Sequence, residues 1–149
     1  MRVLKFGGTS VADAEAIGRL VAIVAARQGC RTVVVSALGG VTDRLLAIAS
    51  LATADLAAAK AELADVLARH FTVAGALRDP TARQMIGVML RGIALGAERA
   101  VEGIAAAGQP SPALLDKLVA AGELWSSRLV AAFLSDAGLH AQWLDGAGT

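Results

Sequence analysis

The residues best suited to chemistry lie at the start of the chain, where the apolar run Val3–Phe6 leads into Gly7-Gly8-Thr9-Ser10. Paired glycines let a backbone approach a ligand closely, and successive N–H groups at the start of a helix attract anions. Lys5 adds a cation at the end of the predicted strand. Ser10 and Asp13 have capping-box spacing, so a helix is expected to begin at Ser10. Although an ordinary tight turn would look the same, the stretch predicts a phosphate site formed by Lys5, Gly7, Gly8, Thr9 and Ser10.

A second candidate stretch, Ser36–Thr42, also contains a glycine pair between two hydroxyl side chains. It follows the β-branched run Thr32–Val35, which is typical of a strand buried on both faces of a parallel sheet. Ser36 is therefore expected at the carboxyl end of a strand, where open α/β sheets bind ligands. Local chemistry alone favours simpler roles, with Ser36 ending the strand and Thr42 capping the next helix.

A third candidate is Glu123, which follows a glycine inside an otherwise apolar helix, in the stretch Gly122–Arg128. The pattern by itself favours a solvated glutamate. Ser126 and Ser127 lie one helical turn further on, and no direct ligand contact is expected for them. Arg128 is expected to be structural.

These stretches, KFGGTSV, SALGGVTD and GELWSSRLVAAFL, resemble the motifs of the aspartate kinases in the amino acid kinase family. The resemblance implies an α/β fold of three αβα layers, like carbamate kinase, with a mostly parallel sheet and a helical insertion. It implies that Ser36 and Thr42 hold the substrate aspartate, that Glu123 meets its ammonium group, and that Lys5 is catalytic. The chain would be the N-terminal part of such a kinase domain, without the ATP-binding half and regulatory domains.

The implied reaction moves the γ-phosphoryl group of ATP, accompanied by Mg²⁺, to the β-carboxylate of L-aspartate. No tightly bound cofactor is expected, and no metal-binding residue can be named. Because the family's catalytic aspartate, second lysine and adenine pocket come from a later stretch, the chain alone is expected to be inactive. It is also expected to self-associate, because half of an open sheet exposes an apolar face or an unpaired edge. Another amino acid kinase, acting on glutamate, acetylglutamate or a carbamate, is an alternative that the GELWS motif disfavours. The second alternative is that the chain is a non-catalytic nucleotide-binding or dimerisation module.

The elements that must position these residues follow from periodicity and from stop signals. Strands are expected at Arg2–Phe6, Thr32–Ser36 and Ala141–Asp145, and a helix from Val11 to Arg27. Between about Asp43 and Ala107 the pattern is helical throughout. Asp79 and Ser111 are predicted helix caps, each followed by a proline at the first helical position. The helices of this region are expected at Arg44–Ser50, Asp55–Leu77, Pro80–Ala107 and from Pro112 to about Gly138.

The predicted helix after Pro80 carries Gly92, Gly96 and Gly103 on one face together with Ala100. Glycine inside a helix costs about 1 kcal/mol against alanine. This face is therefore expected to admit a close neighbouring backbone, from the same chain or from a second subunit. His70 and His140, far apart in the sequence, are expected at the surface or at helix ends.

Composition sets the remaining expectations. The chain has 149 residues, is 56% hydrophobic and carries a formal net charge of +1, which suits one domain and gives no sign of a nucleic-acid partner. Its single cysteine, Cys30, excludes an internal disulfide, fits a reducing compartment and is expected to be a small core residue. The best apolar run, Met85–Ala97, contains Arg91 and is shorter than the roughly 18–20 residues of a membrane span. A cytoplasmic homo-oligomer without a membrane partner is the expectation.

Overall fold

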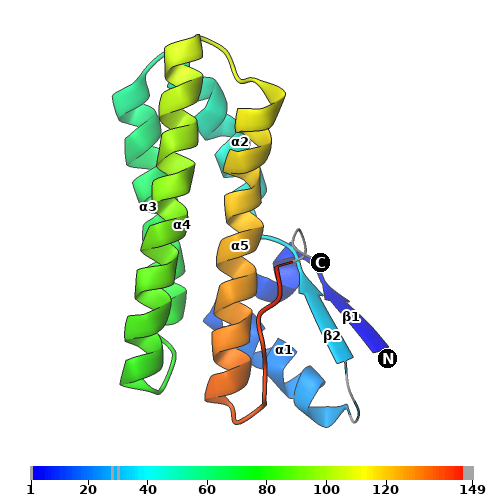
Figure 1. Cartoon of the computed structure of the whole chain (residues 1–149). Helices are drawn as coiled ribbons and strands as arrows, with labels where there is room; N and C mark the ends of the chain where they lie inside the picture. The colour runs from blue at the N-terminus through cyan, green and yellow to red at the C-terminus, as the bar shows by residue number, and fades with distance from the viewer. Residues whose placement is uncertain (1, 28, 30, 146–149) are drawn as a thin grey trace.

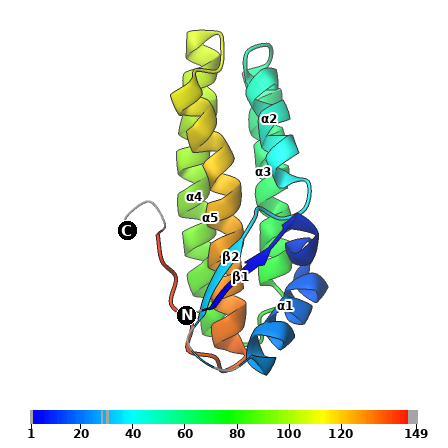
Figure 2. The same cartoon turned by 90° about the vertical axis from the view of Figure 1, so that its right-hand side faces the viewer.

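The computed structural model describes residues 2–27, 29 and 31–145, so Cys30 lies outside the described part. The helices α2 to α5 run side by side as an elongated bundle, and the strands with α1 pack against one part of α5 (Figure 1). Figure 2 shows the two strands lying across α5, with α1 beside them. The elements in chain order are β1 (Arg2–Phe6), η1 (Gly8–Val11), α1 (Ala14–Ala26), β2 (Arg31–Val35), α2 (Val41–Ala52), α3 (Leu56–Ala74), α4 (Pro80–Ala107) and α5 (Pro112–Asp136).

The sheet of the described residues has two parallel strands, in which Phe6 of β1 lies opposite Val35 of β2. Successive side chains point to opposite faces of a strand. On the outer face Val3 is 65% exposed and Val34 is 43% exposed, so the expectation that β2 is buried on both faces is wrong. The side chains packed against the core are Leu4, Phe6, Val33 and Val35.

The predicted third strand at Ala141–Asp145 is also wrong, because these residues form no strand in the described structure. The segment packs on α5 instead. The Trp143 Nε1 donates to Ser127 Oγ at 2.9 Å, and the Arg128 guanidinium lies 3.6 Å from the centre of the Trp143 ring. This cation–π contact gives Arg128 the structural role expected for it.

The first two helices begin at different residues from those predicted. The chain after β1 forms the short 3₁₀ helix η1, and α1 starts only at Ala14 rather than at Ser10. The reason is that Asp13 is itself the cap, since its carboxylate accepts the N–H of Ala16 at 2.8 Å. Helix α2 (Val41–Ala52) extends beyond the predicted Arg44–Ser50 at both ends.

The caps predicted for the two longest helices are confirmed. Asp79 accepts the N–H of Thr81 at 3.0 Å at the start of α4, and Ser111 accepts the N–H of Leu114 at 3.3 Å at the start of α5. A proline occupies the first turn of both helices, where its missing N–H costs no hydrogen bond. The predicted helical region is confirmed with boundaries that differ by a few residues.

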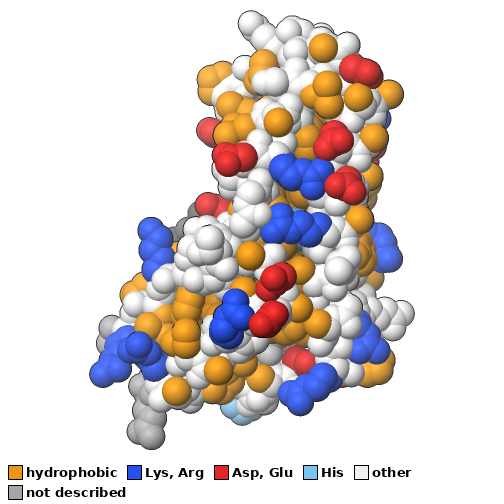
Figure 3. Space-filling model, turned by 180° about the vertical axis from the view of Figure 1, so that it is seen from behind, with side chains coloured by type: hydrophobic (Ala, Val, Ile, Leu, Met, Phe, Trp, Pro, Cys, Tyr) orange, Lys and Arg blue, Asp and Glu red, His pale blue; other side chains and the backbone are white. Residues whose placement is uncertain are grey.

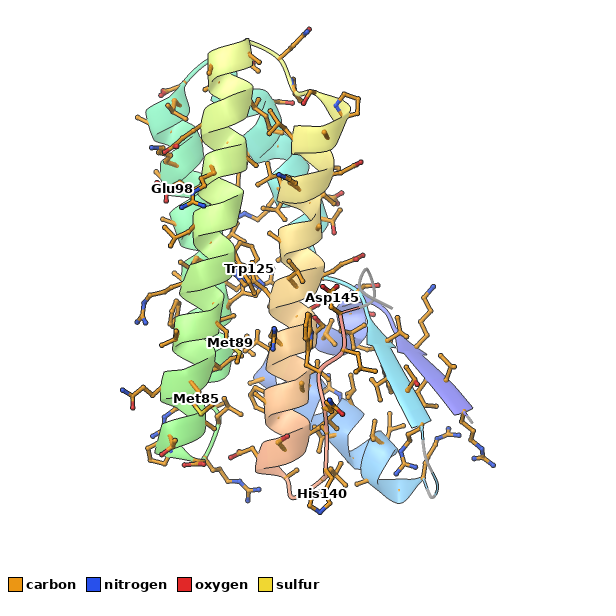
Figure 4. All side chains as sticks on the ribbon, viewed as in Figure 1. Met85, Met89, Glu98, Trp125, His140 and Asp145 are labelled. Atoms are coloured by element: carbon orange, nitrogen blue, oxygen red, sulfur yellow. The ribbon has the colours of Figure 1, made fainter. Side chains whose placement is uncertain are left out.

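The centre of the bundle is organised around Trp125, which points from α5 towards α4 (Figure 4). Its side chain is fully buried, and Nε1 donates to the carbonyl of Leu90 at 3.1 Å. His70 of α3 is fully buried beside it, with 4.7 Å between the ring centres, so the expected surface position of His70 is wrong. Its Nδ1 donates to the Val66 carbonyl at 2.7 Å, whereas Nε2 has no hydrogen-bond partner among the described residues. His140 is exposed, as expected.

The glycine face of α4 does not meet a neighbouring backbone within the described residues. At Gly103 an added Cβ would lie 3.2 Å from the side chain of Leu114 on α5. At Gly92 and Gly96 an added Cβ would meet no atom of the described residues within 4 Å. These two positions line an open groove of about 370 Å³ between α4 and α5.

The distribution of surface charge and the apolar length of α5 test what composition led us to expect about charge and membrane spans. Acidic and basic side chains are interspersed on the face seen in Figure 3. Among the described helices α5 is long and apolar enough to cross a membrane, in contrast to the expected best candidate at Met85–Ala97. The same test is passed by core helices of soluble proteins, and α5 buries Trp125, Leu118 and Leu129 inside the bundle.

We predict that His70 makes the core sensitive to acid. Burial, aided by the charge of Arg69, lowers the pKa of His70 from 6.5 to about 4. Between pH 4 and pH 6.5 the unfolded chain binds more protons than the folded one. The folded protein is therefore most stable with respect to His70 above pH 6.5, where this side chain is neutral in both states, and it loses stability as the pH falls towards 4. The loss from pH 7 to pH 4 should be about 3 kcal/mol.

Urea unfolding at several pH values checks this expectation. The variant His70→Leu should lack the corresponding rise in the free energy of unfolding between pH 4 and 6.5, and the exposed control His140→Leu should keep it. Equal pH dependence in wild type and His70→Leu would contradict the assignment.

Candidate functional site

Two loops meet at the edge where β1 and β2 end: loop 1 (residues 7–13, including η1) and loop 2 (residues 36–40). The ladder extends by one bond, from the N–H of Ser36 to the carbonyl of Phe6 at 3.0 Å. Beyond it the backbones touch. A Cβ built on Gly8 would lie 3.2 Å from the carbonyl oxygen of Ala37, and one built on Gly39 would lie 3.2 Å from that of Gly8. Side chains at these positions would push the loops apart.

Loop 2 places Ser36 and Thr42 on either side of a left-handed turn. Gly40 has φ +81° and is the N-cap residue of α2, with no side-chain cap. Thr42 therefore lies inside the first turn of α2 and is exposed, so it does not cap the helix. Ser36 is half-buried at the carboxyl end of β2. The simpler role considered for Thr42 is thus ruled out, and its hydroxyl is accessible.

Helix α5 packs directly against loop 2. A Cβ on Gly122 would lie 3.0 Å from Ala37 Cβ and 3.2 Å from Val41 Cγ1. One turn later the buried Ser126 donates from Oγ to the carbonyl of Ser36 at 2.7 Å. Glu123, next to Gly122 in the chain, is exposed and makes no ion pair with the described residues. The third stretch therefore joins the site through a close packing contact and one hydrogen bond.

The predicted phosphate residues are accessible at the same edge. Lys5 is exposed and has no carboxylate partner in the described part of the chain. Gly7, Thr9 and Ser10 are exposed, and Gly8 is half-buried against loop 2. The first N–H groups of a helix lack acceptors within it, so η1 presents donors beside the Lys5 strand. This arrangement can bind an anion. No group of three metal-ligating side chains occurs in residues 2–27, 29 and 31–145.

Arg69 is a site residue that sequence reasoning missed. It lies on α3, and its Nη1 donates to the Gly39 carbonyl at 2.7 Å while Nη2 donates to the Ala12 carbonyl at 2.9 Å. One guanidinium thus joins loop 1 to loop 2. An arginine on an amphipathic helix is solvated by default, and nothing in the local sequence distinguishes Arg69 from Arg44, which instead pairs with Glu62 and Asp65.

Comparisons with known proteins agree with the motifs. The profile of the amino acid kinase family matches residues 1–149. The lysine-sensitive aspartokinase 3 of Escherichia coli (strain K12) is 39% identical over 146 residues, which cover 96% of this chain and 30% of that protein. The chloroplastic bifunctional aspartokinase/homoserine dehydrogenase 1 of Arabidopsis thaliana is 31% identical over 144 residues, covering 96% of this chain and 16% of that protein. The chain therefore spans less than a third of the length of these relatives.

Solved structures confirm the predicted fold. Escherichia coli aspartokinase III in complex with lysine and aspartate (T-state) has a TM-score of 0.83 at 32% identity, covering 94% of this chain and 30% of that chain. The same enzyme in complex with aspartate and ADP (R-state) has a TM-score of 0.82 at 32% identity, covering 97% of this chain and 31% of that chain.

The packing at Gly122 generates a stability prediction. Gly122→Ala should lower the free energy of unfolding by about 1–3 kcal/mol, because the new methyl group overpacks the contact with Ala37 and Val41. The control Gly96→Ala lies in α4, where a Cβ meets no atom within 4 Å, and should stabilise the protein by up to about 1 kcal/mol. Urea unfolding measures both variants. A stabilising effect of Gly122→Ala would contradict the close contact between α5 and loop 2.

Proposed function

The chain belongs to the amino acid kinase family, and on this premise we propose that the protein transfers the γ-phosphoryl group of ATP to the β-carboxylate of L-aspartate. The product is 4-phospho-L-aspartate, which begins the synthesis of lysine, threonine and methionine. The observation that carries the proposal is the meeting of the three stretches at one edge, where loop 1, loop 2 and the Glu123 turn of α5 are in contact. A cytoplasmic location and a homo-oligomeric state belong to the same proposal.

Loop 1 and Lys5 are proposed to bind the phosphate groups of ATP. The N–H groups of Gly7, Gly8 and Thr9 supply donors, and the Ser10 hydroxyl lies in the same turn. The Lys5 ammonium neutralises charge that develops on the transferred group. Mg²⁺ enters with ATP as part of the substrate and keeps much of its own water shell, so it needs few protein ligands.

Loop 2 and α5 are proposed to bind aspartate. The hydroxyls of Ser36 and Thr42 can bond its carboxylates, and the Glu123 carboxylate suits its ammonium group, for which an anionic partner is needed. The exposure of Glu123 and its lack of a partner among the described residues support this role. The aspartate present in both aspartokinase III structures supports the choice of acceptor.

In the proposed reaction an oxygen of the β-carboxylate attacks the γ-phosphorus, and the bond from that phosphorus to the bridging oxygen breaks to release ADP. Little covalent work is left for the protein, so catalysis consists of alignment and charge neutralisation. Both reactants are anionic where they meet, and Lys5 provides a positive charge beside loop 1.

We predict that Lys5→Ala, in the gene product that contains this chain, lowers kcat by at least about 100-fold, because one charge-stabilising group is lost. A coupled assay of aspartate-dependent ADP release measures it. Lys117→Ala removes an exposed lysine from α5 and should leave the rate unchanged. Near-normal turnover of the Lys5 variant, with circular dichroism showing both variants folded, would contradict the phosphate site.

Glu123→Gln should raise KM for aspartate far more than KM for ATP. Loss of a charge-assisted hydrogen bond is worth about 1.5–3 kcal/mol, which corresponds to about a 10- to 150-fold rise. The matched control is Glu15→Gln on α1, whose carboxylate pairs only with the exposed Arg19 among the described residues. If both KM values move together, Glu123 does not bind the ammonium group, and the proposed acceptor site fails.

A further inference from the structure

The contact of Arg69 with both loops carries an inference about how the site is held together. The loops touch at Gly8 and Gly39, but no backbone hydrogen bond joins loop 1 to loop 2 among those of the described residues. Beyond the bond from Ser36 to Phe6, the contact between the loops themselves is van der Waals contact, which has no preferred direction. The donors of Arg69, at 2.7 Å and 2.9 Å from the Gly39 and Ala12 carbonyls, supply the directional restraint that the backbones lack.

The restraint comes from a rigid part of the molecule. Arg69 lies next to the fully buried His70 on α3, between core positions Val66 and Val73. Its own side chain is half-buried, so water competes less well for the two carbonyls. The bundle therefore fixes the guanidinium, and the guanidinium fixes the loops.

We propose that Arg69 is a positioning residue, which sets the separation of loop 1 and loop 2 through the carbonyls of Ala12 and Gly39. The inference deepens the proposed function and rests on it for its kinetic consequence. Loop 1 carries the phosphate donors and loop 2 carries Ser36 at the acceptor side. Their separation consequently determines how closely the γ-phosphorus and the attacking carboxylate are aligned, and a shift of about 1 Å can cost about 100-fold in rate.

Arginine is specifically suited to this task. Its planar guanidinium presents N–H donors in a fixed fork and reaches two acceptors at once, whereas the lysine ammonium is a compact charge on a flexible stem. Arg69→Lys is thus expected to restore one of the two contacts. Arg69→Gln keeps a polar side chain on α3 but is too short to bridge both carbonyls.

A purely structural arginine offers the matched control. Arg44 joins α2 to α3 through Glu62 at 3.0 Å and Asp65 at 2.9 Å, and among the described residues these carboxylates are its only side-chain partners. Arg44→Gln removes a helix-to-helix link of similar exposure without touching a loop carbonyl. Comparison of the two variants separates positioning of the loops from packing of α3.

The kinetic experiment measures kcat and KM for aspartate and ATP in the gene product that contains this chain. Arg69→Gln should lower kcat by about 30- to 100-fold while each KM changes by less than about 3-fold, because each loop keeps its own binding groups. Arg69→Lys should recover part of the loss, and Arg44→Gln should stay within about 2-fold of wild type in kcat. A fall in kcat no larger than that of Arg44→Gln, or a rise in KM at unchanged kcat, would overturn the inference.

Hydrogen–deuterium exchange tests the restraint without any reaction. In Arg69→Gln the amides of residues 8–12 and 36–41 should exchange at least about 10-fold faster than in wild type, while amides around Leu90 in α4 remain unchanged. Unchanged exchange in both loops would overturn the inference. Absence of aspartate-dependent transfer in the wild-type protein would overturn the proposed function instead, and the exchange result then decides the role of Arg69 by itself.

Discussion

The backbone contact between Gly8 and Gly39 is the constraint on which the arrangement of this chain depends. Parallel strands end at one edge of a sheet, but they bring the following loops into touch only if neither loop carries a side chain at the crossing point. A Cβ at either glycine would lie 3.2 Å from a carbonyl oxygen of the other loop. Gly122 repeats the device where α5 approaches loop 2. The two loops and α5 can therefore meet because Gly8, Gly39 and Gly122 carry no side chain.

The helical bundle gives this edge a rigid support. Trp125 links α5 to α4 through its hydrogen bond to the Leu90 carbonyl, and the His70 ring of α3 packs against the Trp125 ring in a tilted arrangement. Helices α5 and α3 each contribute one polar side chain that reaches the loops. Ser126 of α5 donates to the Ser36 carbonyl, and Arg69 of α3 donates to one carbonyl in each of loops 1 and 2. These hydrogen bonds connect the closely packed bundle directly to both loops. The long helical excursion thus has a direct structural link to the site.

Sequence alone predicted the features that depend on near neighbours. The caps at Asp79 and Ser111 bond residues two and three positions away, and the glycine-rich turns carry their conformational requirement in their own composition. What it could not predict depends on distant partners. Arg69 reaches residues 30 and 57 positions away, and Ser126 reaches 90. Ala141–Asp145 was predicted to form a strand, but Trp143 packs on α5 and the segment has no ladder partner among the described residues. The predicted surface position of His70 was wrong for the same reason, because its burial depends on Trp125 of another helix.

The charges at the site suggest how an amino acid acceptor would be oriented. Lys5 and Glu123 are both exposed, and they form no ion pair with each other or with any other described residue. Under the proposed function, these two accessible charges of opposite sign complement an amino acid that carries a second carboxylate. In the proposed function the ammonium group of the acceptor lies at Glu123, and its side-chain carboxylate must face the phosphoryl donor bound by loop 1 and Lys5. The proposed roles of these two charges therefore imply a single orientation of the acceptor in the site.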